Sequence, residues 1–304
     1  MGIVSVLVCT RDRPEPLTRA VHSLLATKGV DLELIVIDQS DGPQSEQALD
    51  DLIGDPRLKY SRSRARGKGA ALNEGVRMAR GAVMVCTDDD CEASADWVAG
   101  MARILEEQPK VAVVFCNVTA GAHDSAAGYI PTFVRHRSRL LSSIDAVRDG
   151  LGLGAGMAVR RAAVLALGGF DEAFGPGARF ASGDEWDISQ RALLGGWHVY
   201  QTAHLSILHH GFLTFAEGSR HTRRDWTSTG ALAAKLVRAG RLHAATIPIW
   251  LFCVYGLWPP FFDLLRLRKP GQLARTVGFV QGFLEGVRTP VDRGTLIYQP
   301  RPSR

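Results

Sequence analysis

Three consecutive aspartates, Asp88, Asp89 and Asp90, directly follow an apolar run over Ala82–Thr87. Adjacent carboxylates repel one another, so such a group is costly unless water or a cation compensates its charge. Mg²⁺ and Mn²⁺ suit it, because each accepts one or two protein carboxylates and fills its other positions with water and phosphate oxygens. The alternative is a solvated acidic turn that caps the following helix. The aspartates alone leave both interpretations open.

Apolar runs rich in Val and Ile alternate with amphipathic segments of helical length in the first 90 residues. The expected strands are Ile3–Cys9, Leu32–Ile37 and Ala82–Cys86, and the expected helices are 15–27, 44–53 and 70–79. Apolar strands joined by helices predict a parallel sheet covered on both faces, whose ligands bind beyond the carboxyl ends of the strands. Because Asp12, Asp38 and Asp88 follow three of these strands, we expect them at one crevice.

Further along, the pattern predicts more strands and helices and then changes character. A helix is expected over 96–107, a strand over 111–118, a helix after Asp184, and strands near 197–200 and 205–208. Beyond His210 the pattern becomes helical and basic. This change predicts an α/β domain followed by a helical extension.

Several segments, taken in order, resemble the family 2 glycosyltransferases of the GT-A fold. They are residues 4–13, 33–38, 67–75, the DxD-like Asp88–Asp90, and then 154–161, 167–172, 183–187 and 208–211. The resemblance spans about the first 210 residues and implies an α/β fold with a Rossmann-like mixed sheet. It also implies a nucleotide-diphosphate sugar donor and a divalent cation, Mg²⁺ or Mn²⁺. We expect a catalytic domain over 1–215, with a nucleotide-sugar half (1–117) and an acceptor half (118–215), and a C-terminal region over 216–304.

The same resemblance implies roles for individual residues. The expected nucleotide-sugar contacts are Thr10, Arg11, Asp38, Lys68, Asn73, Asp88 and Asp89. The expected metal ligands are Asp88, Asp90 and His209, and Trp186 and Asp187 are expected on the acceptor side. Plainer interpretations stay open: Asp38 as a turn residue, His209 as a structural histidine, and Arg11, Lys68 and Asn73 as surface residues.

The expected catalytic base comes from a motif that departs from the family. The usual order is Glu-Asp-x-Asp, whereas this chain has Asp184, Glu185, Trp186 and Asp187. Transfer position by position gives the role of the base to Glu185, with Asp184 as the second candidate. Asp184 also suits a helix-capping role, since a carboxylate at that place accepts hydrogen bonds from backbone N–H groups.

Composition indicates an ordered globular protein, with 46% hydrophobic and 22% charged residues. The five cysteines are odd in number and have no CxxC spacing, so we expect buried free thiols in a reducing compartment. The first residues begin a strand pattern without a secretory signal. These features predict a cytoplasmic protein.

The C-terminal third is strongly basic. From Ser219 onward there are 14 Lys and Arg against 4 Asp and Glu, which predicts an anionic partner. Ala244–Phe262 carries no charge and is followed by Arg266, Arg268 and Lys269. Pro259 and Pro260 are expected to end a helix near Trp258, which is too short to cross a bilayer, so we expect attachment at an anionic membrane surface with 273–288 as a second amphipathic helix. A spanning helix and a buried helical subdomain are the alternatives.

Together these features favour an inverting, metal-dependent glycosyltransferase that transfers a sugar to a sugar or lipid-linked acceptor at the inner face of the plasma membrane. A sugar nucleotidyltransferase and a nucleotide-sugar-binding protein with a degenerate transferase fold are the alternatives. A nucleotidyltransferase would usually have a glycine-rich motif after the first strand, but this chain has Thr10-Arg-Asp-Arg-Pro14 there. A degenerate binding protein conflicts with the intact acidic residues. No zinc spacing or RNP pattern supports nucleic-acid binding.

Overall fold

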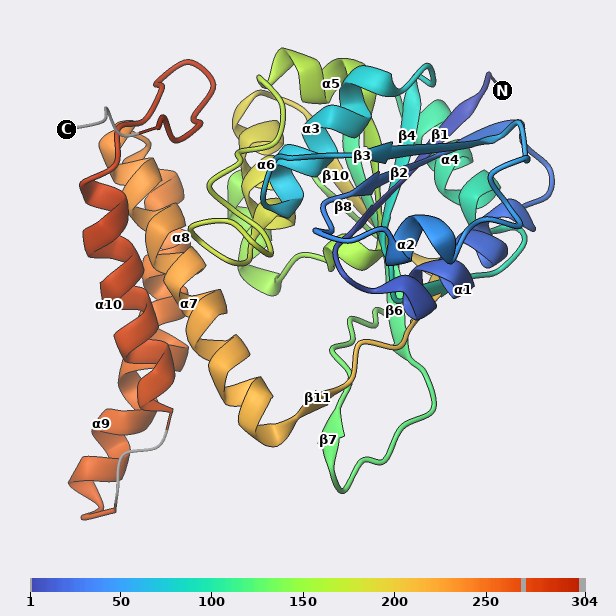
Figure 1. The fold of residues 1–304 in the computed structure, drawn as a ribbon. Helices are drawn as coiled ribbons and strands as arrows, with labels where there is room; N and C mark the ends of the chain where they lie inside the picture. Colours follow the sequence, from blue (N-terminus) through green and yellow to red (C-terminus); the bar gives the residue numbers. More distant parts are fainter. Residues whose placement is uncertain (1, 269–271, 301–304) are drawn as a thin grey trace.

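A mixed β-sheet lies at the centre of the computed structural model, which describes residues 2–268 and 272–300 (Figure 1). In these residues it has nine strands in the order β3-β2-β1-β4-β9-β6-β10-β5, with β8 (Arg139–Leu141) paired to β10. A separate pair, β7 (Gly128–Tyr129) and β11 (Leu213–Thr214), forms an arm at the lower edge of Figure 1. The mixed α/β sheet and the C-terminal helical extension predicted from sequence are both confirmed.

The amino-terminal strands are parallel and buried. They are β1 (Val4–Thr10), β2 (Leu32–Asp38), β3 (Leu58–Arg62) and β4 (Val83–Asp88). Alternate residues point to opposite faces, so Val4, Val6 and Val8 pack with α1 (Pro14–Leu25) and α4 (Trp97–Glu107). On the other face Leu7 packs with α3 (Lys68–Met78) and α6 (Asp184–Leu194). Because these strands run parallel, their carboxyl ends lie at the same edge of the sheet.

One strand from the predicted acceptor half completes the predicted nucleotide-sugar half. β9 (Met157–Arg160) lies antiparallel between β4 and β6 (Val111–Ala120), and it pairs with both. The short helix α5 (Arg161–Ala166) follows it directly. The two halves therefore share one sheet, and the division at residue 117 stays a prediction about substrate contacts.

Three local predictions differ from the structure. The helix expected over 44–53 is a single turn, α2 (Gln44–Gln47), because Asp50, Asp51 and Gly54 are poor helix formers. The half-buried β3 was not predicted, since its sequence LKYSR is largely polar. The strands expected near 197–200 and 205–208 form one strand, β10 (His198–His209), with an irregularity between Gln201 and Ser206; the short β5 (Cys91–Ala93) pairs at its other edge.

The C-terminal region is a group of helices packed against the sheet domain. It contains α7 (Phe215–Arg238), α8 (Leu242–Leu251), a π-helical segment over Phe252–Leu257, α9 (Trp258–Leu265) and α10 (Leu273–Val287). α7 and α10 lie side by side in Figure 1, and glycines let their backbones approach. A Cβ atom on Gly230 would meet backbone atoms of α10, and one on Gly278 would lie 2.5 Å from the Arg223 carbonyl oxygen.

The helix does not end at the prolines, which corrects the prediction for Trp258. Residues Leu242–Leu265 form one continuous helix of 24 residues. Pro259 and Pro260 have no N–H for the carbonyls of Tyr255 and Gly256, four residues earlier. Two side chains of α10 take their place: Thr276 donates to the Gly256 carbonyl at 2.6 Å and Arg275 to that of Tyr255 at 3.3 Å. A π-helical turn and these bonds together let the helix pass the prolines.

A buried lysine joins α7 to the sheet domain. Lys235 is 1% exposed, and its ammonium pairs with Asp171 at 2.6 Å and with Asp187. It also lies over the ring of Phe174, 4.7 Å from the centroid, and beside that of Tyr298. The second half of α7 therefore belongs to the core of the molecule.

Replacement of Lys235 by Met is expected to destabilise the protein by about 3–5 kcal/mol, because two buried carboxylates lose their shared cation. Urea unfolding followed by circular dichroism measures this change. Lys110→Met, at an exposed position, is the matched control and should leave the free energy of unfolding within about 0.5 kcal/mol. Equal stability of the two variants would contradict the network's structural role.

Candidate active site

A cavity of about 550 Å³ opens at the carboxyl ends of β1 and β4. Its walls come from the loops after these strands, the end of β10, the Pro176–Gly177 loop and α7. Of the residues predicted from sequence, Thr10, Arg11, Lys68, Asp88, Asp89, Asp90 and His209 line it. The structure thus brings most of the predicted donor-site and metal-site residues to one place.

The aspartates of the β4 loop are held by residues of the β1 loop. Thr10 donates a hydrogen bond to Asp89 at 2.7 Å, and Arg13 bridges Asp89 at 2.6 Å and Asp90 at 2.7 Å. Burial raises the pKa of Asp89 to about 7, although Arg13 and Thr10 act in the opposite direction. Arg13 therefore offsets the repulsion between neighbouring carboxylates.

Asp90 and His209 form a set of donors that fits a divalent cation. Their Oδ1 and Nε2 atoms lie 3.3 Å apart, and the buried Asp90 Oδ1 has no hydrogen-bond partner among the described residues. His209 Nδ1 faces the Pro131 carbonyl at 3.1 Å, which fixes Nδ1 as the donor and leaves Nε2 as a ligand atom. A Cβ atom on Gly211 would lie 2.5 Å from His209 Nε2, so glycine keeps this space open.

The neighbouring groups also bear on metal binding. Cys91 completes a potential ligand group with Asp90 and His209, but burial raises the pKa of its thiol well above the usual range, and a thiol is a poor ligand for Mg²⁺ or Mn²⁺. Asp88 lies outside this group, and its Oδ1 accepts from Lys68. Burial lowers the pKa of His209, but the nearby Asp90 carboxylate and the Pro131 carbonyl outweigh burial and raise that pKa.

The predicted base adjoins this cavity through Lys68. A Cβ atom on Gly154 would lie 3.3 Å from Lys68 Nζ and 3.8 Å from Glu185 Oε2, so the ends of both side chains approach this glycine. Burial and then the charge of Asp184 raise the pKa of Glu185 well above its usual range, while Lys68 acts in the opposite direction. Asp184 is buried, and its Oδ2 has no hydrogen-bond partner in the described part of the chain. The raised pKa makes the Glu185 carboxylate a stronger base once it is ionised.

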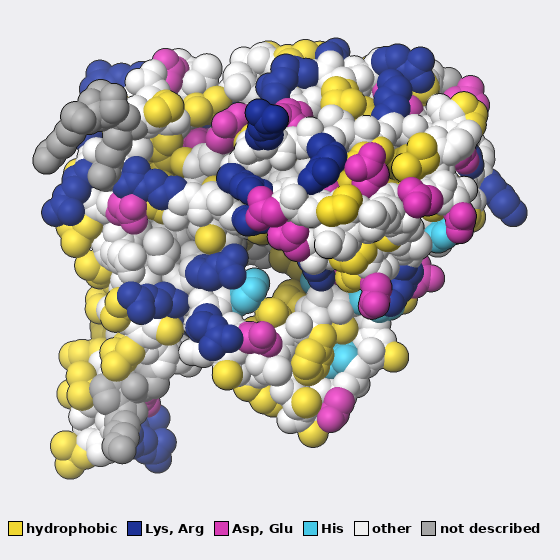
Figure 2. Space-filling model, viewed as in Figure 1, with side chains coloured by type: hydrophobic (Ala, Val, Ile, Leu, Met, Phe, Trp, Pro, Cys, Tyr) yellow, Lys and Arg dark blue, Asp and Glu magenta, His cyan; other side chains and the backbone are white. Residues whose placement is uncertain are grey.

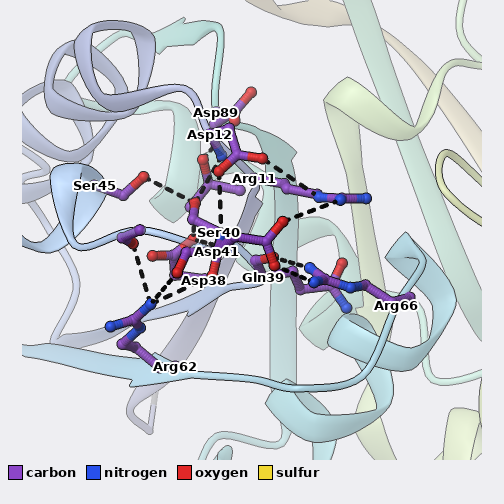
Figure 3. A network of polar contacts seen from close by, with 12 residues as sticks. Arg11, Asp12, Asp38, Gln39, Ser40, Asp41, Ser45, Arg62, Arg66 and Asp89 are labelled. Atoms are coloured by element: carbon purple, nitrogen blue, oxygen red, sulfur yellow. Dashed lines mark hydrogen bonds and ion pairs between the residues drawn. The ribbon is translucent and has the colours of Figure 1, made fainter.

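Asp38 lies behind the cavity, in a network of the β1 and β2 loops (Figure 3). Its side chain is fully buried and accepts hydrogen bonds from Ser40, at 2.5 Å from the hydroxyl, and from Tyr60. The next residue, Gln39, lines the cavity instead. The oxygens of Asp38 are already bonded within the protein, and the nucleotide contact expected from this residue stays a prediction.

Three other predicted residues, Asn73, Asp187 and Trp186, do not line this cavity and have partners within the protein. Asn73 bonds the backbone of Phe170 at 2.8 and 3.0 Å and lines a different cavity. Asp187 is 1% exposed and pairs with Arg191 at 2.8 Å as well as with Lys235. Trp186 packs against two hydrophobic clusters of the core. Packing and ion pairing occupy these side chains within the protein, and their substrate contacts stay predictions.

Four of the lining residues with polar side chains were given no role from sequence: Arg13, Gln39, His221 and Arg224. Arg13 and Gln39 each stand within three residues of a predicted one, so strand-end position was a usable signal. His221 and Arg224 come from α7, whose basic composition was noted but assigned to an outside partner. Their place at the cavity depends on how α7 crosses the domain.

Comparison with known proteins shows where related sequences and folds occur. Residues 5–163 match the sequence profile of glycosyl transferase family 2. A glucosyl-dolichyl phosphate glucuronosyltransferase of Haloferax volcanii is 28% identical over 114 residues, which are 36% of each chain. The succinoglycan biosynthesis protein ExoO of Rhizobium meliloti is 34% identical over 88 residues, which are 29% of this chain and 25% of that protein. The match thus spans about a third or less of these relatives.

Two solved structures share the fold over most of the chain. TarS 1–349 of S. aureus superimposes with a TM-score of 0.64 at 14% identity, over 95% of this chain and 81% of that one. The mannosyltransferase PcManGT of Pyrobaculum calidifontis, in complex with GDP-Man and Mn²⁺, gives a TM-score of 0.61 at 17% identity, over 94% and 87% of the two chains. At these identities the likeness concerns the fold.

Proposed function

This chain belongs to glycosyl transferase family 2, and from that premise we propose that it transfers a sugar from a nucleotide-diphosphate sugar to an acceptor hydroxyl with inversion. We further propose that the reaction depends on Mg²⁺ or Mn²⁺ and serves polysaccharide or glycolipid synthesis. The observation that carries the metal proposal is the pairing of Asp90 with His209 beside the glycine at 211. PcManGT, which shares the fold, was solved with GDP-Man and Mn²⁺.

The proposed roles follow from the positions of the side chains. Asp90 and His209 hold the cation, which neutralises the diphosphate leaving group when bound. Lys68 and Arg11 line the same cavity and offer positive charge to phosphate oxygens. Glu185 takes the proton of the acceptor hydroxyl as that oxygen attacks the anomeric carbon from the side opposite the leaving group. Direct displacement of this kind inverts the anomeric configuration.

A panel of nucleotide sugars tests the proposal. The protein is incubated with UDP-, GDP- and dTDP-sugars and Mn²⁺, and release of the nucleoside diphosphate is measured with and without candidate acceptors. We expect release from one donor class, dependent on the cation. Formation of a nucleotide sugar from a sugar phosphate would instead indicate a nucleotidyltransferase, and tight donor binding without any release would indicate a binding protein.

We also propose that the protein attaches peripherally to the inner face of the plasma membrane. One helix in the described residues, Leu242–Leu265, is long and apolar enough to cross a membrane by length and composition. Its far end carries Trp258, Phe261 and Phe262, all about half exposed and with ring centroids 5.6–6.0 Å apart. In Figure 2, hydrophobic side chains lie beside basic ones near the lower end of the helical region.

The geometry of this tip supports attachment at the interface. Arg266 and Arg268 directly follow the helix that ends at Leu265. Lys269, the third basic residue expected here, lies outside the described residues. Leu267, between these two arginines, is 97% exposed. Aromatic and aliphatic side chains among arginines suit the boundary between headgroups and acyl chains of an anionic membrane.

Replacing the aromatic tip should abolish membrane attachment. The triple change Trp258→Ser, Phe261→Ser and Phe262→Ser is expected to lower flotation with phosphatidylglycerol vesicles by at least tenfold. The matched control replaces three equally exposed residues of the sheet domain, Ile53, Leu140 and Leu165, by Ser. A wild type that stays at the bottom of the gradient, or equal flotation of both variants, would contradict attachment through this tip. Release of the wild type at high pH and high salt distinguishes peripheral attachment from a spanning helix.

A further inference from the structure

Among the described residues, four Arg and Lys side chains line the active-site cavity: Arg11, Arg13, Lys68 and Arg224. The first three have carboxylate partners. Arg13 pairs with Asp89 and Asp90, and Lys68 pairs with Asp88. Arg11 lies 3.5 Å from the carboxylate of Asp12 and 3.6 Å from that of Asp41. Arg224 differs, because its guanidinium donates to the Ala181 carbonyl at 3.2 Å and no carboxylate of the described residues lies within 4 Å.

His221 stands next to Arg224 on the same face of α7. The two residues are three positions apart, which places them one above the other on a helix, and both line the cavity. Burial and then the charge of Arg224 lower the pKa of His221, although Asp225 and Glu217 on the same helix act in the opposite direction. At this wall, Arg224 supplies a positive charge for which no ion pair is found among the described residues, and His221 supplies an imidazole beside it.

Arg224 and His221 come from a different element than the carboxylates of the proposed metal site. They come from α7, whereas Asp88 and Asp90 come from the loop after β4. In Figure 2, basic side chains gather over α7 where it faces the hollow beside the β7–β11 arm. Phe212 and Leu213, at the start of that arm, line the same cavity with apolar surface. Positive and apolar groups are thus presented together.

We propose that Arg224 and His221 bind a phosphate group of the acceptor. The inference rests on the proposed transferase function and names the chemical class of its second substrate. The guanidinium presents paired N–H donors that match phosphate oxygens, and His221 supplies one more donor. Phe212 and Leu213 then contact the group that the phosphate carries. Because their surface is apolar, an alkyl chain suits this position better than a polar group.

Octyl phosphate is the probe, with glycerol 3-phosphate and octanol for comparison. Each is titrated calorimetrically into wild-type protein that is already saturated with Mn²⁺ and with whichever of UDP and GDP binds. We expect octyl phosphate to bind to this complex. Octanol should not bind measurably, because it lacks the charge. Binding of glycerol 3-phosphate as tightly as octyl phosphate would assign the site to a water-soluble phosphate, and weaker binding would assign it to a lipid phosphate.

Arg224→Gln is expected to weaken octyl phosphate at least tenfold while leaving the nucleoside diphosphate affinity within twofold. Arg220→Gln is the matched control, since Arg220 is exposed on the same helix and does not line the cavity. Equal weakening by both variants would overturn the proposal, because it would reveal general charge attraction. Loss of octyl phosphate binding upon saturation with nucleotide would also overturn it, because the site would then belong to the donor diphosphate.

Failure of the proposed function gives a different result. If neither UDP nor GDP binds with Mn²⁺, the donor site is refuted. Octyl phosphate titrated into the free protein then still tests Arg224, because the comparison of Arg224→Gln with Arg220→Gln needs no nucleotide. The two proposals can therefore fail separately.

Discussion

The Asp90→Asn protein is expected to lose sugar transfer by about 10²–10³-fold, the largest loss expected of any single replacement at the metal site. The neutral amide is a weaker ligand for a hard cation and cannot compensate its charge. Without the bound cation, the diphosphate leaves less readily. Nucleoside diphosphate affinity should fall with it, but only when Mn²⁺ or Mg²⁺ is present, and calorimetry with and without EDTA measures that difference.

Glu92→Gln is the control for this replacement. Glu92 lies two residues further on, is exposed, and faces His210 at 3.3 Å rather than the cavity. It should retain transfer within about twofold. Normal rates in Asp90→Asn, or a wild type that remains fully active in excess EDTA, would refute metal dependence.

The second large effect concerns the base. Glu185→Gln should lose transfer by at least ~10²-fold and keep its nucleotide affinity, because the amide cannot accept the acceptor proton. Burial and Asp184 raise the pKa of Glu185, so the wild-type rate should rise with pH as this carboxyl loses its proton. That rise should be absent from the variant. A pH series of initial rates with saturating donor makes the comparison.

Asp184 provides the contrasting variant. Near-normal transfer by Glu185→Gln together with an inactive Asp184→Asn would move the base to Asp184. The stereochemistry is an independent check, and NMR of the product measures it. A retained anomeric configuration would overturn direct displacement whichever carboxylate acts.

Sequence predicted those site residues that stand at the ends of strands. Asp88 and Asp90 follow a clear apolar run, so a parallel sheet places them at the carboxyl end of a strand, where ligands bind. His209 likewise stands at the end of a strand, as the last residue of β10. These residues depend mainly on local pattern and strand direction, both of which are written in the nearby sequence.

Residues on helices were harder to place, because a motif does not say which side chain faces inward. Asp187 belongs to the same motif as Glu185, yet it points to Lys235, which is 48 residues away in the sequence. Asn73 likewise lies on α3 but holds the backbone at Phe170. Arg224 reaches the cavity only because α7 passes over it. Such contacts are decided by tertiary packing, which periodicity does not record.

The position of β9 constrains how the chain can be made and divided. A nascent chain that ends at Ala120 contains β4 and β6 but not the strand that joins them, so both present open apolar edges. Open edges of this kind recruit other chains and call for chaperones during synthesis. Once Arg160 has left the ribosome, β9 can pair with both β4 and β6, while the other edge of β6 still lacks β10. A split version of this enzyme should therefore be cut after β9 rather than at residue 117, because only the longer fragment contains the strand that joins β4 to β6.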